Sequence, residues 1–129
     1  MGKSVLFINT TCTQPASLEV LRKSGYRVDM VYDAGTGLRK LDTKGYDAVI
    51  LQESPEAESW RLCRKIRQIA AIPLIVISNR ASTDACVKAI KAGADFFMRK
   101  PFGPLEFSAR LQSLLQRRLP APQAVPIGR

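Results

Sequence analysis

The sequence predicts an α/β protein built on a doubly wound, five-stranded parallel sheet with five helices. Along the 129 residues, short apolar segments alternate five times with amphipathic ones. Three of the apolar segments, VLFI, AVIL and LIVI, contain no polar residue, which is typical of strands buried on both faces of a parallel sheet. Regular alternation of strands and helices predicts right-handed βαβ units, with helices covering both faces of the sheet.

The strands are expected where short apolar segments lie between turn residues. They are predicted at Ser4–Ile8, Arg27–Val31, Ala48–Leu51, Leu74–Ile77 and Asp95–Met98. The second and fifth segments are more mixed in polarity than the other three, as sheet edges or shorter strands would be.

Capping residues delimit the first and fourth helices. Pro15 suits a first helical turn with Thr13 as its N-cap, and Gly25 closes that helix. Ser82 is the expected N-cap of the fourth helix, and Gly93 lies just beyond its end.

The third and fifth helices carry apolar stripes that should face the core. In the third, Leu62, Ile66 and Ile69 recur at i, i+4 and i+7. The opposite side is expected to be a solvated cationic face made of Arg61, Arg64, Lys65 and Arg67. In the fifth helix, opened by Pro104, the expected buried residues are Leu105, Ala109, Leu111 (or Phe107) and Leu115.

Composition narrows the class of protein. The length favours one domain, and the apolar fraction of 46% excludes disorder for most of the chain. No apolar run reaches the ~18 residues of a membrane span, and the N-terminus has no signal-peptide pattern. Three cysteines without a CxxC pair, and no histidine, argue against a disulfide framework and a zinc site. We expect a cytoplasmic protein without membrane association.

The charge balance is the least ordinary feature of the composition. Twenty Lys and Arg residues stand against 11 Asp and Glu, which gives a net charge of +9. A nucleic-acid site usually combines such charge with aromatic residues or a recognition motif. No such combination is visible beside the cations of the third helix, so direct DNA binding by this chain is not expected.

Candidate functional residues follow the strands, because ligands of a doubly wound sheet bind beyond the carboxyl ends of its strands. Asn9 and Thr10 come after the first strand, Gln52 after the third and Ser78 after the fourth. Lys100 follows the fifth.

Four segments resemble a CheY-like receiver domain of bacterial two-component response regulators: YDAVIL, IPLIVISNR, AGADFFMRKPF and LEFSARLQSLLQRR. The resemblance runs from Val5 to about Arg118. It implies the flavodoxin-like strand order 2-1-3-4-5 and a regulatory role, not an enzymatic one.

The resemblance also marks where this sequence departs from the family. A receiver that accepts a phosphoryl group has two acidic residues after the first strand, which hold Mg²⁺, and an aspartate that ends the third strand. Here the acidic pair is replaced by Asn9 and Thr10, and the phosphoacceptor by Gln52. The hydroxyl residue, the switch aromatic and the lysine of the family are kept as Ser78, Phe97 and Lys100.

These replacements remove the chemistry of phosphorylation. Transfer to a carboxylate needs a nucleophilic oxygen and a divalent cation, and Mg²⁺ sites use one or two carboxylates. The only nearby acid, Glu53, lies one step along the strand and is expected to point to the opposite face from Gln52. We therefore expect no phosphorylation, no Mg²⁺ or other metal, no cofactor and no catalytic residue.

Lys100 would then face a degenerate pocket that has lost its anions. Because a buried, unpaired ammonium is costly, Lys100 is expected either to donate to the side-chain oxygens of Asn9 and Gln52, or to bind an external anion. The first alternative is preferred.

The last helix resembles the winged-helix (OmpR/PhoB-type) branch, in which the fourth helix, fifth strand and fifth helix form a symmetric dimer. The expected interface residues are Lys88, Asp95, Phe96, Glu106 and Arg110, with Phe96 in place of a second acid. After the receiver domain, residues 1–118, the Pro-rich residues 119–129 are expected to be a linker or a tail, and they lie where such proteins attach a DNA-binding domain.

The sequence thus predicts an atypical, phosphorylation-independent receiver that forms a homodimer and regulates transcription through an attached DNA-binding domain. Two alternatives stay open. One is a stand-alone protein-interaction module, and the other is a receiver-like sensor of a small ligand or anion at Lys100.

Overall fold

The computed structural model describes residues 2–11, 15–53, 59–79, 82–100 and 102–117. Strands and helices alternate along the chain in the order β1 (Ser4–Asn9), α1 (Ala16–Lys23), β2 (Arg27–Val31), α2 (Ala34–Thr43), β3 (Ala48–Glu53), α3 (Ser59–Ile69), β4 (Leu74–Asn79), α4 (Thr83–Lys91), β5 (Phe96–Lys100) and α5 (Pro104–Arg117). None of the helices in these ranges is long and apolar enough to cross a membrane.

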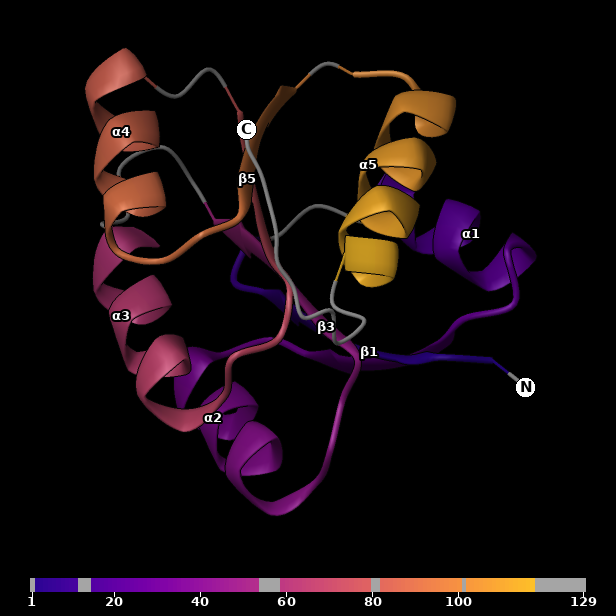
Figure 1. The fold of residues 1–129 in the computed structure, drawn as a ribbon, viewed down its shortest axis with the longest axis horizontal. Helices are drawn as coiled ribbons and strands as arrows, with labels where there is room; N and C mark the ends of the chain where they lie inside the picture. Colours follow the sequence, from indigo (N-terminus) through magenta and orange to yellow (C-terminus); the bar gives the residue numbers. More distant parts are fainter. Residues whose placement is uncertain (1, 12–14, 54–58, 80–81, 101, 118–129) are drawn as a thin grey trace, which may run out of the picture.

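The five strands form one parallel sheet in the order β2-β1-β3-β4-β5. Helices cover both of its faces, with α1 and α5 on one side and α2, α3 and α4 on the other (Figure 1). The predicted fold class and strand order are confirmed.

Neighbouring residues of the central strands face two separate cores. Leu6 and Val49 belong to the core under α2, α3 and α4, whereas Phe7 and Ile50 belong to the core under α1 and α5. All four are fully buried. Both faces of each central strand are covered, which explains why these segments of the sequence are apolar without alternation.

The central strands extend beyond their last apolar residue. β3 ends at Glu53 and β4 at Asn79, two residues later than predicted, and β5 is Phe96–Lys100 where Asp95–Met98 was predicted. The parallel pairing continues through these polar ends, as the pair formed by Asn9 and Gln52 shows. Apolar patterning cannot detect a polar residue that remains in the ladder.

The helix termini follow the predicted capping with one correction. The Ser82 hydroxyl accepts from the Ala85 N–H at 3.0 Å, and both Gly25 and Gly93 have the positive φ that closes a helix. Pro15 is wrong as a first-turn residue, because it has an extended ψ of 130° and is itself the N-cap. The predicted cap Thr13 lies outside the described residues.

Two predicted core stripes are corrected by the packing. In α5, Phe107, Leu111 and Leu115 are buried, whereas Leu105 is 83% exposed and Ala109 is exposed. The buried residues recur every four positions, and a residue two positions away lies on nearly the opposite side of a helix.

In α3, Leu62 and Ile66 are buried as predicted, but Ile69 is 37% exposed. Arg67 was expected on the solvated face and instead packs against the chain, where its Nε donates to the Gly93 carbonyl at 2.8 Å.

Candidate functional site

Three of the predicted site residues meet at the carboxyl ends of the central strands. Asn9 of β1 and Gln52 of β3 are direct neighbours in the sheet, and Ser78 of β4 pairs with Glu53. Asn9, Gln52 and Ser78 are each at most 2% exposed. These buried polar residues therefore lie at the carboxyl ends of the strands, which is where doubly wound sheets bind their ligands.

A chain of neutral hydrogen bonds joins β1 to β3 at this edge. The Asn9 Oδ1 accepts from the N–H and the hydroxyl of Thr11, at 3.1 Å and 2.6 Å. The Gln52 Nε2 donates to the same Thr11 hydroxyl at 3.3 Å. The Thr10 N–H donates to the Gln52 carbonyl at 3.0 Å. Sequence reasoning missed Thr11, whose only signal was a second threonine after a strand end.

Lys100 does not take the partners that were expected for it. Within the described ranges, no hydrogen bond joins Lys100 to Asn9 or Gln52, and the buried Gln52 Oε1 accepts none. The Gln52 nitrogen donates to Thr11 instead. Lys100 pairs with Asn79 in the β4–β5 ladder and is half-buried.

Phe97 of β5 is partly buried and packs against the core under α2, α3 and α4.

Glu53 points away from Gln52, as strand geometry predicted. One of its carboxylate oxygens is buried without a hydrogen-bond partner. Burial, and then the negative charge of Glu53, raise the pKa of the Cys63 thiol in α3 to about 12. The carboxylate therefore faces α3 and does not replace an acid at position 52.

The residues of this edge do not fit Mg²⁺. Asn9, Thr10 and Gln52 supply amide and hydroxyl oxygens with no formal charge, whereas Mg²⁺ is bound through one or two carboxylates. In the part of the chain that the structure describes, no group of three His, Cys, Asp or Glu residues is arranged to hold a metal.

The predicted interface residues engage partners within the chain. Asp95 Oδ2 accepts from Arg67 at 2.6 Å, and the exposed Lys88 pairs with Asp84 at 3.3 Å. The Phe96 ring lies 4.5 Å from the Arg110 guanidinium carbon, a cation–π contact.

Glu106 is exposed in the first turn of α5. Apolar side chains are exposed on the same helices, namely Val87 (43%) and Ile90 (42%) in α4 and Leu105 (83%) in α5.

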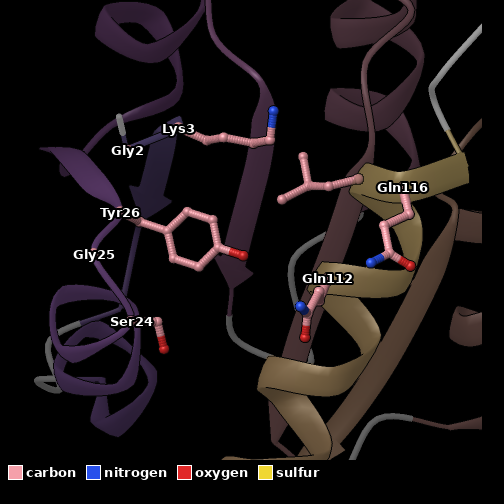
Figure 2. Close-up of a pocket in the computed structure, with 8 residues that line it drawn as sticks. Gly2, Lys3, Ser24, Gly25, Tyr26, Gln112 and Gln116 are labelled. Atoms are coloured by element: carbon pink, nitrogen blue, oxygen red, sulfur yellow. The ribbon is translucent and has the colours of Figure 1, made fainter.

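A hollow lies at the opposite, amino-terminal end of the strands. It has a volume of about 320 Å³ and lies between the end of α1, the start of β2 and α5. The Tyr26 ring extends into it, and Gln112 and Gln116 of α5 line the far side (Figure 2). Burial raises the pKa of Tyr26. Among the described residues, no carboxylate lines this hollow, and none of the predicted site residues lies in it.

Comparison with known proteins agrees with the fold described above. A family model described as the response regulator receiver domain matches residues 13–112. The transcriptional activator protein IrlR of Burkholderia pseudomallei is 33% identical over 98 residues, which are 75% of this chain and 43% of IrlR. The response regulator ArlR of Staphylococcus aureus is 37% identical over 98 residues, 75% of this chain and 45% of ArlR. The chain thus spans less than half the length of these relatives.

Solved structures share the fold at lower identity. A CheY-like receiver domain protein from Methanospirillum hungatei superposes with a TM-score of 0.80 at 23% identity, over 91% of this chain and 96% of that one. A two-component response regulator from Clostridium difficile gives a TM-score of 0.79 at 21% identity, over 92% and 99%.

Proposed function

We propose that this chain, which belongs to the response regulator receiver domain family, regulates an attached transcriptional effector without being phosphorylated. One observation carries the proposal. At the edge where the family's chemistry takes place, Asn9 and Gln52 lie side by side, buried and uncharged.

The site cannot supply either half of the phosphoryl-transfer reaction. A carboxylate nucleophile and a cation that neutralises the developing charge are both required. Gln52 offers an amide in place of the nucleophile, and its nitrogen already donates to Thr11. Glu53 is turned toward α3 and the Cys63 thiol, so the neighbouring acid is not a substitute.

Neutrality also suits a receiver held in one state. The hydrogen bonds among Asn9, Thr11 and Gln52 join the ends of β1 and β3 through neutral groups. A change of state in a two-state protein needs a ligand that interacts differently with the two states. With the metal and phosphate ligands gone, output would depend on the amount of protein or on a protein partner.

Transcriptional output is supported by the role of a relative. IrlR is a transcriptional activator, and the matched residues cover 43% of its length. We place a DNA-binding domain after α5, with the Pro-rich residues 119–129 as the linker, and expect the chain to work as a homodimer in the cytoplasm.

The test is incubation with acetyl phosphate and Mg²⁺, followed by intact-mass measurement. We expect no increment of one phosphoryl group in the natural sequence. The matched control is the Asn9→Asp/Thr10→Asp/Gln52→Asp variant, which restores the missing carboxylates and should bind Mg²⁺ with a rise in Tm. A phosphoryl adduct on the unaltered chain, mapped to this edge, would overturn the proposal.

A further inference from the structure

A second hollow, on the outer surface between α3 and α4, combines an indole with three cations. Its volume is about 250 Å³, and Trp60, Arg64, Lys88, Lys91 and Ala92 line it. The two helices lie next to each other on the same face of the sheet (Figure 1). Trp60 and Arg64 are one helical turn apart on α3, so both face the end of α4.

The exposed charges on the described residues of α3 and α4 are mostly positive. The exposed charged side chains of α3 and α4 are Arg61, Arg64, Lys65, Asp84, Lys88 and Lys91. The one carboxylate among them, Asp84, forms an exposed i,i+4 pair with Lys88. Glu56 and Glu58, which precede α3, lie outside the described residues. Cations that converge on one hollow repel one another, and an anionic ligand relieves that repulsion.

Trp60 holds two of the neighbouring guanidinium groups. The Arg61 and Arg64 guanidinium carbons each lie 5.1 Å from the centre of the indole ring. Such contacts fix a flexible arginine at little entropic cost. The stack presents planar surfaces of the kind on which nucleic-acid bases stack, since bases stack on both aromatic rings and guanidinium planes.

We propose that this α3–α4 hollow binds a nucleotide unit, with its base against the Trp60–Arg64 stack and its phosphates on Lys88 and Lys91. The volume of about 250 Å³ limits the ligand to no more than one unit, because it lies below the ~300–1,000 Å³ of sites for drug-sized ligands. The sequence did not indicate this site, since Trp60 and the two lysines are brought together only by the packing of α3 against α4. The proposal does not depend on the state of the phosphorylation edge.

The base and phosphates could belong to a free nucleotide or to a nucleic-acid strand. The chain contains a single tryptophan, so the intrinsic emission of Trp60 reports on this hollow directly. The full chain is titrated in parallel with ADP, a short oligothymidylate, adenosine, tripolyphosphate and poly-L-glutamate. We expect saturable quenching by ADP or by the oligonucleotide, and at least about tenfold weaker binding of adenosine and tripolyphosphate, because base and phosphate are both needed.

The two sources are distinguished by affinity and salt. A strand is the source if the oligonucleotide binds at least about tenfold more tightly than ADP, with an affinity that falls steeply with salt. A free nucleotide is the source if ADP binds as tightly as the oligonucleotide. In either case the proposal is supported.

A matched pair of variants separates this hollow from general electrostatic attraction. Arg64→Ala/Lys91→Ala removes two cations that line it, and Arg39→Ala/Lys40→Ala removes one arginine and one lysine from the exposed surface of α2. The first should weaken nucleotide binding about tenfold or more, and the second should change it less than about twofold. Lys88 is left in place because it also belongs to the expected dimer face.

Three outcomes would overturn the proposal. They are an unchanged Trp60 emission at every ligand concentration, equal weakening by the two double variants, and binding of poly-L-glutamate as tight as that of the oligonucleotide. The last would assign the surface to acidic protein segments.

Discussion

Arg67 and Asp95 are joined by a hydrogen bond of 2.6 Å between Nη2 and Oδ2, and this pair connects α3 to the start of β5. The same Asp95 oxygen accepts from the Leu74 N–H at 2.8 Å, so one carboxylate also holds the start of β4. Arg67 further donates to the carbonyls of Gly93 and Ile72. A residue of the expected dimer interface therefore has a structural role inside the chain.

We predict that Arg67→Ala destabilises the fold by about 2–4 kcal/mol, because it removes one of the two donors of the Asp95 carboxylate and the arginine donor of the Gly93 and Ile72 carbonyls. Urea unfolding at pH 7 measures the loss. Lys65→Ala, on the same helix but exposed, is the control and should change the free energy of unfolding by less than about 0.5 kcal/mol. Equal effects of the two substitutions would contradict the structural role of Arg67.

Self-association, the second prediction, should depend on apolar contacts. Asp95 is occupied within the chain, whereas Val87, Ile90 and Leu105 are exposed on α4 and α5. We expect Ile90→Glu/Leu105→Glu to weaken the dimer at least about tenfold, since a two-fold interface contains each altered residue twice. Analytical ultracentrifugation over a concentration series measures the dissociation constant.

The control for that experiment is Ile69→Glu, which alters an apolar residue of similar exposure (37%) on α3. It should leave the dimer unchanged. An unaltered dissociation constant for the α4–α5 variant would place the interface elsewhere, and a natural chain that is monomeric at all concentrations would remove dimerisation from the proposed function.

Thiol reactivity is the third prediction. Cys63 is fully buried and its pKa is about 12, raised by burial and then by Glu53, whereas Cys86 is only partly buried. Because the thiolate is the reactive form, Cys63 should react with a disulfide reagent at pH 8 only as fast as the protein unfolds, and Cys86 should react in the native state.

Variants with a single cysteine measure this difference, Cys12→Ser/Cys63→Ser reporting Cys86 and Cys12→Ser/Cys86→Ser reporting Cys63. Adding Glu53→Gln to the second should lower the Cys63 pKa, because it removes a neighbouring negative charge, while burial keeps the thiol slow. Rapid native-state reaction of Cys63 would contradict its burial, and an unchanged Cys63 pKa in the Glu53→Gln variant would contradict the position of Glu53 against α3.

The fold was predictable because the central strands are buried on both faces. Continuous apolar segments such as VLFI and LIVI have no other stable place in a small α/β protein. Which side of a helix faces the core was harder to predict where two different sets of apolar residues could form the buried stripe. Leu105 and Phe107 both lie in the first turns of α5, and only the packing against α1 selects Phe107 for the core.

The candidate site was predictable in its position but not in its hydrogen bonds. Strand ends placed Asn9, Gln52 and Ser78 at one edge. The bond from the Gln52 nitrogen to Thr11 and the lack of one from Lys100 depend on side-chain positions that no residue pattern encodes. The α3–α4 hollow was invisible for a related reason, since its residues come from helices that are far apart in the sequence.

The last prediction concerns the acid side of stability, at the Asp29 carboxylate of β2. The Tyr46 hydroxyl donates to Asp29 Oδ2 at 2.5 Å, and Lys44 Nζ lies 3.0 Å from the same oxygen. The Tyr46 hydrogen bond first, and then that of Lys44, hold the pKa of Asp29 below its ordinary value of 3.8. A depressed carboxyl pKa adds stability above the unfolded value, and that stability is lost as the pH falls through the folded pKa.

Tyr46→Phe should therefore cost about 1–2 kcal/mol at pH 7, where Asp29 is ionised, and less at pH 2.5, because the stability that a depressed carboxyl pKa adds declines once the pH falls below the unfolded value. Urea unfolding of the variant and the natural chain at the two pH values gives the difference. Tyr32→Phe, at a tyrosine that is 65% exposed, is the control and should be neutral at both. A cost that is the same at pH 7 and pH 2.5 would mean that the contribution of the Tyr46 hydroxyl does not depend on the ionisation of Asp29.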